Sequence, residues 1–148
     1  MELTRAADYA LRGVLYLSLQ PEGTLSVISE IAEQMDIPEG FLARIFQTLA
    51  KSGIIRSHRG KKGGFSLALP AEEINMRKVI ETMEGPIHLN RCLNGYGDCG
   101  RGTLCSLHDV WCRIQEQVIT TLGETTFSYL AQQTKNKMQE HPPAESSS

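Results

Sequence analysis

Residues 26–69, SVISEIAEQMDIPEGFLARIFQTLAKSGIIRSHRGKKGGFSLAL, decide the fold of this 148-residue chain. Apolar residues recur at helical spacing in two segments, which the short turn Asp36-Ile37-Pro38 separates. Pro38 suits the first turn of the second segment, where its missing N–H costs nothing, and Ser52-Gly53 ends that segment. Two helices are therefore predicted, one opened by Ser26 and one following Pro38. Their expected inward residues are Val27, Ile28, Ile31 and Met35 in the first, and Phe41, Leu42, Ile45, Phe46 and Leu49 in the second.

Two short strands follow these helices. Residues 54–58 lead into a glycine- and lysine-rich turn, and residues 65–69 return with strict alternation of apolar and small residues. The chain as a whole carries a net charge of −2, yet residues 41–69 contain six basic residues and no acid. A basic stretch within a mildly acidic chain favours a nucleic-acid face. The basic residues are Arg44, Lys51, Arg56, Arg59, Lys61 and Lys62.

Capping signals place the other helices. Thr4 is expected to cap a helix to about Leu19, and Asn75 a helix that ends at Gly85-Pro86. Ile74 and Val79 form a plausible hydrophobic staple across the second of these caps. The pattern Ser106-x-x-Asp109 predicts a capping box for the longest helix, about 107–122. A shorter segment, 125–133, is expected to pack back.

This order of elements predicts a mainly α fold with a small β-wing, a winged helix-turn-helix domain followed by a dimerisation helix. The expected divisions are a DNA-binding domain (1–86), a loop (87–106), the dimerisation helix with its packing segment (107–134) and a disordered tail (135–148). Side chains expected to meet DNA are Gly40, Arg44 and Gln47 in the reading helix, and Arg56, Arg59, Lys61 and Lys62 in the wing. The apolar stripe of the long helix is expected to pair two copies, with a place in the core of a single domain as the alternative; its residues are Leu107, Trp111, Ile114, Val118 and Leu122.

A glycine-rich loop carries Cys92, Cys99, Cys105 and His108 with the spacing Cys-x6-Cys-x5-Cys-x2-His. Three thiolates and an imidazole are a metal-site composition. The start of the chain lacks a signal peptide and no stretch is apolar enough to cross a membrane, so we expect a cytoplasmic protein, in which structural disulfides are rare. Zinc is an alternative occupant, but the tight Cys-x2-4-Cys pair usual for zinc is missing, and the long gaps favour an iron–sulfur cluster.

Over about residues 1–134, the chain resembles the winged-helix iron–sulfur regulators that include IscR, NsrR and RirA. The matching segments are MELTRAADYALR at the start, IPEGFLARIFQTLAKSGIIRSHRGKKGGFSLA across the reading helix and wing, and the three-cysteine loop before a long helix. The resemblance implies a homodimeric bacterial transcription factor, such as a repressor or redox sensor, that binds double-stranded operator DNA and carries one cluster on each subunit.

The resemblance also implies the ligand set. An IscR-like site would hold [2Fe–2S], favoured here over [4Fe–4S], through Cys92, Cys99, Cys105 and His108, although the first cysteine gap is six residues here and five in IscR. An NsrR-like site would replace His108 with Asp8 of the partner subunit. Cys112 lies outside the usual set. Four residues after His108, it shares that helix face and is an alternative ligand, but we expect a buried core thiol.

Other classes of function remain as alternatives. A zinc-stabilised or thiol-switch winged-helix regulator would use the same cysteines without a cluster. An enzyme is not expected, because the chain has no Ser/His/Asp order, paired carboxylates or nucleotide loop. No small-molecule substrate and no membrane partner is expected.

Overall fold

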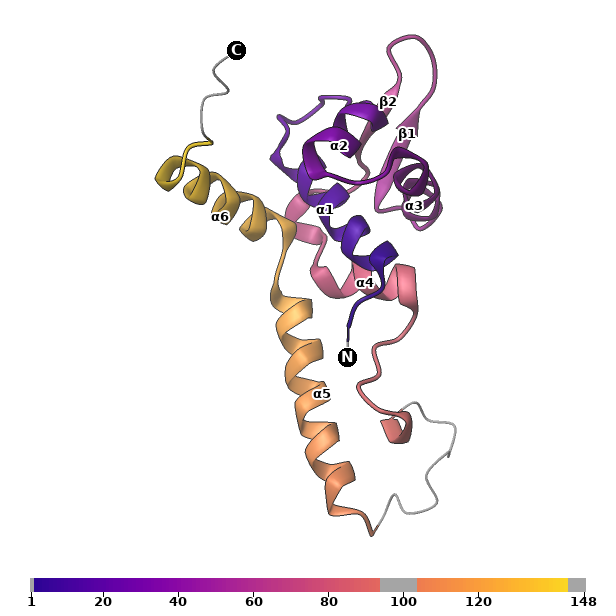
Figure 1. The fold of residues 1–148 in the computed structure, drawn as a ribbon, viewed down its shortest axis with the longest axis vertical. Helices are drawn as coiled ribbons and strands as arrows, with labels where there is room; N and C mark the ends of the chain where they lie inside the picture. Colours follow the sequence, from indigo (N-terminus) through magenta and orange to yellow (C-terminus); the bar gives the residue numbers. More distant parts are fainter. Residues whose placement is uncertain (1, 94–103, 144–148) are drawn as a thin grey trace.

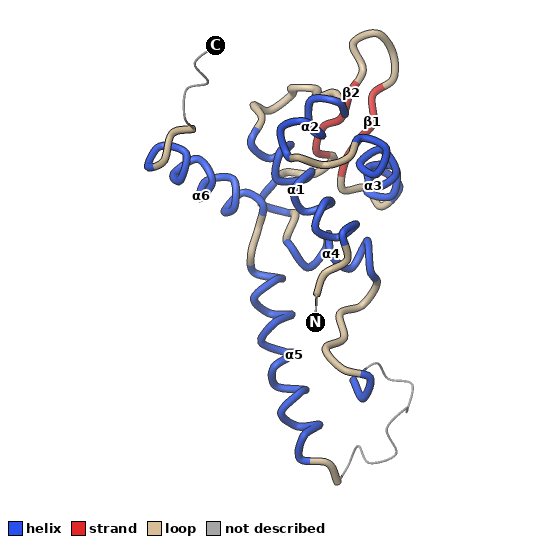
Figure 2. Tube along the Cα trace, in the orientation of Figure 1, coloured by secondary structure: helices blue, strands red, loops and turns tan. Residues whose placement is uncertain are grey.

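The structure is a computed structural model that describes residues 2–93 and 104–143. A winged-helix body lies at one end, and one long helix projects from it toward the other end (Figures 1 and 2). The elements in chain order are α1 (Arg5–Leu19), α2 (Ile28–Met35), α3 (Glu39–Lys51), β1 (Ile55–His58), β2 (Gly64–Leu67), the 3-10 turn η1 (Ala71–Glu73), α4 (Met76–Glu84), the 3-10 turn η2 (Arg91–Leu93), α5 (Ser106–Glu124) and α6 (Phe127–Glu140).

The expected caps of α1 and α4 are confirmed. The backbone N–H of Ala7 donates to Thr4 Oγ1 at 3.1 Å. That of Lys78 donates to Asn75 Oδ1 at 2.8 Å. Ile74 and Val79, on either side of the second cap, are both fully buried, as a hydrophobic staple requires.

Helix α1 runs through the centre of the body and packs against α2, α3, α4 and α6. Gly13 allows α1 and α3 to pack closely, because a Cβ there would lie 2.5 Å from the Phe46 ring. The core that results has buried members from all of these helices and from the start of the hairpin: Val14, Leu17, Ile31, Leu42, Phe46, Leu49, Ile54, Val79 and Phe127.

Two expectations for α2 and α3 are wrong. Helix α2 begins at Ile28, because Ser26 pairs with Phe65 through two backbone hydrogen bonds of 2.8 and 3.0 Å and is therefore part of the sheet edge. This leaves Val27 at the cap, 47% exposed. Phe41 is 56% exposed rather than inward. It meets the edge of the Tyr9 ring, with 6.5 Å between the ring centroids.

Two expectations for the C-terminal half also fail. Ser106 is the first residue of α5 and Cys105 is the cap, with no side-chain capping bond, so the capping box does not form. Helix α6 continues to Glu140, six residues into the segment expected to be disordered, and Thr126 caps it by accepting from the N–H of Tyr129. The expected packing back is confirmed, since Phe127 and Ala131 are buried and α6 contacts α1. No helix in the described part of the chain is long and apolar enough to span a bilayer.

Candidate nucleic-acid interface and cysteine segment

The turn between α2 and α3 sets the orientation of α3 relative to α2. Asp36 closes α2 in the left-handed conformation (φ 54°), a region that asparagine and aspartate tolerate better than most residues. The N–H of the next residue, Ile37, donates to the Ala32 carbonyl at 2.9 Å, and the Ile37 side chain is buried. The face of α3 that points away from the core meets solvent. Gly40, Arg44 and Gln47 on this face are exposed as predicted.

The hairpin β1–β2 packs against α3 and pairs with the segment before α2. Phe65 in β2 packs edge-to-face on Phe46, with 5.0 Å between ring centroids, and its backbone pairs with Ser26. The turn requires glycine, because Gly60 has φ +112° and a Cβ on Gly63 would collide with the His58 carbonyl.

The wing projects from one end of the molecule (Figure 1). Its four predicted contact residues, Arg56, Arg59, Lys61 and Lys62, are all exposed. His58 at its base lies half-buried with Nε2 at 3.0 Å from Ser66 Oγ. An exposed helix face with an arginine and a glutamine, flanked by a basic hairpin, has the groups needed to read base edges and bind phosphates.

Two described parts of the cysteine segment (87–106), η2 and the start of α5, lie toward the opposite end of the long axis from the wing (Figure 1). Cys92 lies in η2, which runs beside α5, and the N–H of Leu89 donates to Gln115 Oε1 of α5 at 3.0 Å. Cys105 is at the start of α5, and Cys99 falls outside the described residues. Cys92, Cys105 and Cys112 are half-buried free thiols. Residues 2–93 and 104–143 do not by themselves bring three or more His, Cys, Asp or Glu side chains together to hold a metal ion.

His108 and Cys112 pair on one face of α5, where Nε2 of the imidazole lies 3.4 Å from the thiol Sγ. The other ring nitrogen, Nδ1, is buried and has no hydrogen-bond partner among residues 2–93 and 104–143. The expectation of a buried core thiol at Cys112 is wrong, because the residue is half-buried and its sulfur meets a polar ring.

Asp8 is far along the chain from the cysteines and belongs to a small network on α1. Its carboxylate forms an ion pair with Arg12, with 2.8 Å between Asp8 Oδ2 and Arg12 Nη2, and both side chains are nearly half exposed. Arg12 also donates to the Met35 carbonyl at the end of α2 and lies over the Tyr9 ring, 5.5 Å from its centroid. Sequence reasoning missed Arg12 and Tyr9, although the i,i+4 spacing of Asp8 and Arg12 is a signal for such a pair.

Helix α5 has no buried residue in the single chain. Leu107 is 68% exposed and Ile114 37% exposed, and Val110, which sequence reasoning missed, is 44% exposed. Trp111, Val118 and Leu122 are half-buried. A shallow groove along this helix is lined by Ile114, Gln117, Val118, Thr121 and Leu122.

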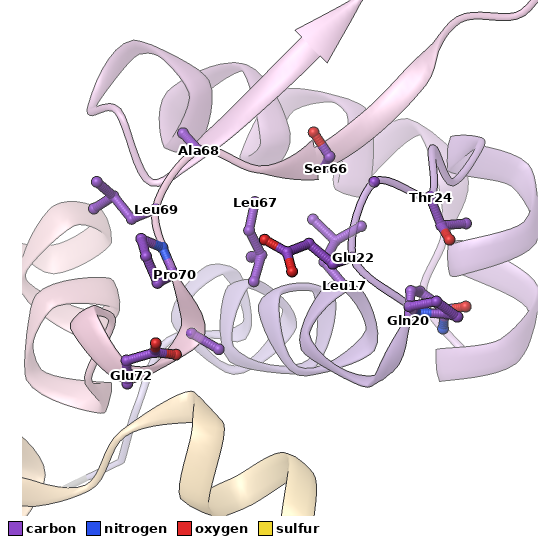
Figure 3. Close-up of a pocket in the computed structure, with 13 residues that line it drawn as sticks. Leu17, Gln20, Glu22, Thr24, Ser66, Leu67, Ala68, Leu69, Pro70 and Glu72 are labelled. Atoms are coloured by element: carbon purple, nitrogen blue, oxygen red, sulfur yellow. The ribbon is translucent and has the colours of Figure 1, made fainter.

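A separate pocket of about 440 Å³ lies between the end of α1 and residues 66–72. Figure 3 shows Leu17 and Leu67 at its base, with Glu22 and Glu72 among the side chains around it. Its lining contains no His, Cys, Lys or Arg. It belongs to neither the basic face nor the cysteine segment.

Three relatives match between 64% and 95% of this chain. An HTH-type transcriptional regulator of Haemophilus influenzae is 32% identical over 141 residues, which are 95% of this chain and 93% of that protein. The regulator IscR of Vibrio cholerae is 29% identical over 88% of this chain and 75% of its own length. The regulator NsrR of Shouchella clausii is 38% identical over 64% of this chain and 63% of its own length.

The fold is also that of a solved regulator. The structure of CymR, the global cysteine regulator of B. subtilis, superposes with a TM-score of 0.75 at 24% identity, covering 89% of this chain and 97% of that one. Residues 3–133 match the Rrf2 family, described as iron-dependent transcriptional regulators. The chain, a winged helix with an exposed reading helix and a basic wing, therefore belongs to the Rrf2 family of transcriptional regulators, which are DNA-binding proteins and not enzymes.

Proposed function

We propose that this regulator is a cytoplasmic homodimer that binds operator DNA and senses redox, nitric oxide or iron status through a cysteine-ligated iron–sulfur cluster. The observation that carries the proposal is the donor set of residues 92–108. This stretch contains three cysteines and His108, and the imidazole keeps one buried nitrogen without a partner among the described residues. A buried polar atom without a partner lowers the stability of the fold. A metal bound to this nitrogen would remove that cost.

Cys92, Cys99 and Cys105 would supply the thiolates, and the free N–H groups at the start of α5 favour an anionic assembly beside them. A cluster held in this way supplies metal–thiolate bonds that oxidation, nitric oxide or iron loss can break. The residues present fit such a group in donor chemistry, with [2Fe–2S] favoured over [4Fe–4S] for a set that includes an imidazole.

His108 is the better supported fourth ligand. It follows Cys105 by one helical turn, and its Nδ1 is available. Asp8 of the partner subunit is the second candidate, but in this structure the Asp8 carboxylate is already paired with Arg12. Asp8 could bind a metal only if that ion pair opened.

The position of the cysteine segment suggests how its state would reach DNA. The wing lies at one end of the molecule, and η2 and the start of α5 lie toward the other (Figure 1), so we do not expect the cysteines to act directly on DNA contacts within one subunit. The segment instead joins α4 to α5, and the apolar face of α5 is the proposed dimer surface. We infer that release of the segment changes the tilt of α5 and hence the spacing of the two reading helices, which must be about 34–36 Å apart.

A thiol switch without a metal is the rival, and the likeness in fold to the cysteine regulator CymR favours it. Structural zinc on the same cysteines is a further alternative. Both predict a colourless protein.

Anaerobic purification tests the proposal. We expect a brown protein with stoichiometric iron and sulfide, and loss of colour in Cys92→Ala and Cys105→Ala. Zinc without iron, or thiols alone, would contradict the proposal.

Gel shifts at fixed salt then test the sensing role. Removal of the cluster should change the affinity for a specific operator at least 10-fold while non-specific binding stays within about 2-fold, because bulk phosphate attraction does not depend on half-site spacing. Equal operator affinity for the two forms would leave a merely structural metal.

A further inference from the structure

The proposed ligand set leaves the role of Cys112 open. We propose that Cys112 is a positioning residue whose sulfur accepts a hydrogen bond from the Nε2–H of His108. The imidazole then offers Nδ1 to the cluster. This inference rests on the proposed function. It concerns the atom by which His108 would bind and the residue that selects that atom.

The geometry of the ring carries the first step. Nε2 is occupied, since it lies 3.4 Å from Cys112 Sγ, whereas Nδ1 is buried without a partner. A neutral imidazole has one N–H and one lone pair. If Nε2 carries the proton it can donate to the sulfur, and the lone pair is then on Nδ1. The opposite tautomer would leave a buried N–H donor at Nδ1 with no acceptor among the described residues.

Helix geometry keeps the pair in place. His108 and Cys112 are four residues apart, and side chains at that spacing lie one above the other on the same face of a helix. Cys105, the cap residue of α5, precedes His108 by three residues, so a proposed ligand thiol and the positioning thiol lie before and after the imidazole in the sequence. Helix α5 is continuous from Ser106 to Glu124, so the pair needs no loop to form.

The chemistry gives this contact a purpose. A histidine that binds a metal through one nitrogen nearly always donates its other N–H to a neighbouring acceptor, which fixes the tautomer and makes the ring a stronger ligand. The usual acceptors are carboxylates, carbonyls and water. Cys112 Sγ is the only partner that the structure gives the His108 ring among the described residues.

Two substitutions separate positioning from ligation in the holoprotein. Cys112→Ala removes the acceptor, whereas Cys112→Ser keeps an oxygen that can accept from Nε2–H. We expect Cys112→Ala to retain iron about 10–100-fold less well against a chelator, the range for removal of such a partner. Its midpoint potential and its ¹⁴N hyperfine coupling should shift, and Cys112→Ser should restore both to near the wild-type values. Arg113→Ala, at an exposed neighbouring position, is the control that should change neither.

Three outcomes in the holoprotein overturn the inference. Bleaching in both Cys112 variants would make Cys112 a ligand. Wild-type potential and coupling in Cys112→Ala would leave the thiol without a role at the ring. Equal shifts in the alanine and serine variants would point to packing and not to a hydrogen bond.

The apoprotein gives a readout that does not depend on a cluster. In ¹⁵N-labelled apoprotein at neutral pH, two-bond couplings should show His108 protonated at Nε2, and Cys112→Ala should raise the share of the Nδ1–H tautomer. A wild-type ring protonated at Nδ1 overturns the inference. An iron-free wild-type protein overturns the proposed function instead, and the two failures are therefore distinguishable.

Discussion

Gly13 and Gly40 are both helical glycines, but alanine should have opposite effects at the two positions. A Cβ on Gly13 would lie 2.5 Å from the ring of Phe46, which is fully buried and packed against Phe65, so a shift of the ring would disturb the core. Overpacking of this kind costs about 1–3 kcal/mol, which exceeds the gain in helix propensity. A Cβ on Gly40 meets nothing within 4 Å.

We therefore expect Gly13→Ala to lower the free energy of unfolding by about 1 kcal/mol and Gly40→Ala to raise it by about 0.5 kcal/mol. Urea unfolding of the apoprotein measures both. A stabilising Gly13→Ala would mean that α1 and α3 are not in close contact in solution.

At this scale, sequence patterns predicted two of the three expected local caps, since the Ser106 capping box does not form, and they failed at two positions where a distant neighbour decides. The Thr4 and Asn75 caps depend only on the next few residues, and both were predicted correctly. Phe41 matches the apolar pattern of α3, yet its partner is Tyr9 on α1, more than 30 residues earlier, and the ring stays half exposed. The pairing of Ser26 with Phe65 shortened α2 for the same reason.

At the scale of elements, the wing and the reading helix should contribute differently to DNA binding. Arg59 and Lys61 lie at the exposed hairpin turn, where they can reach phosphates. Alanine at either should weaken binding to all sequences and reduce the salt slope by about one for each phosphate that is no longer neutralised. Arg44→Ala on α3 should cost about 1–3 kcal/mol at one preferred base and relax discrimination there.

Filter binding of operator and scrambled DNA over a series of salt concentrations separates these effects. Arg113→Ala on α5, far from both elements, should change neither. A loss of discrimination in the wing variants with no change in salt slope would contradict the division of roles.

Element order was predictable because caps, turns and periodicity agree from α1 to α4. The end of the chain was not. Residues 135–140 are polar and were expected to be disordered. They are helical because α6, which begins after Thr126, buries Phe127 and Ala131 and continues to Glu140. The candidate site was predictable in its residue types and spacing. Its internal pairings, Asp8 with Arg12 and His108 with Cys112, required the three-dimensional structure because each residue has several possible neighbours on its helix.

At the scale of the whole molecule, α5 has no buried residue and an exposed apolar face. A stable single chain rarely leaves such an apolar face uncovered. A second copy is the proposed cover. In a two-fold interface each residue appears twice, so Ile114→Glu would place two carboxylates in an apolar seam. We expect this variant to be monomeric at concentrations where the wild type is dimeric, with sedimentation velocity as the measurement.

The same substitution separates folding from assembly and assembly from DNA reading. Ile114 is 37% exposed in the single chain, so Ile114→Glu should leave the far-ultraviolet circular dichroism of the body unchanged. Arg113→Glu, an added acid one residue away at another exposed position, should remain dimeric and serves as the matched control. Operator affinity should fall at least 10-fold in Ile114→Glu, because one reading helix engages only one half-site. Retention of the dimer in that variant would show that a different face joins the subunits, and the proposed coupling through α5 would then fail.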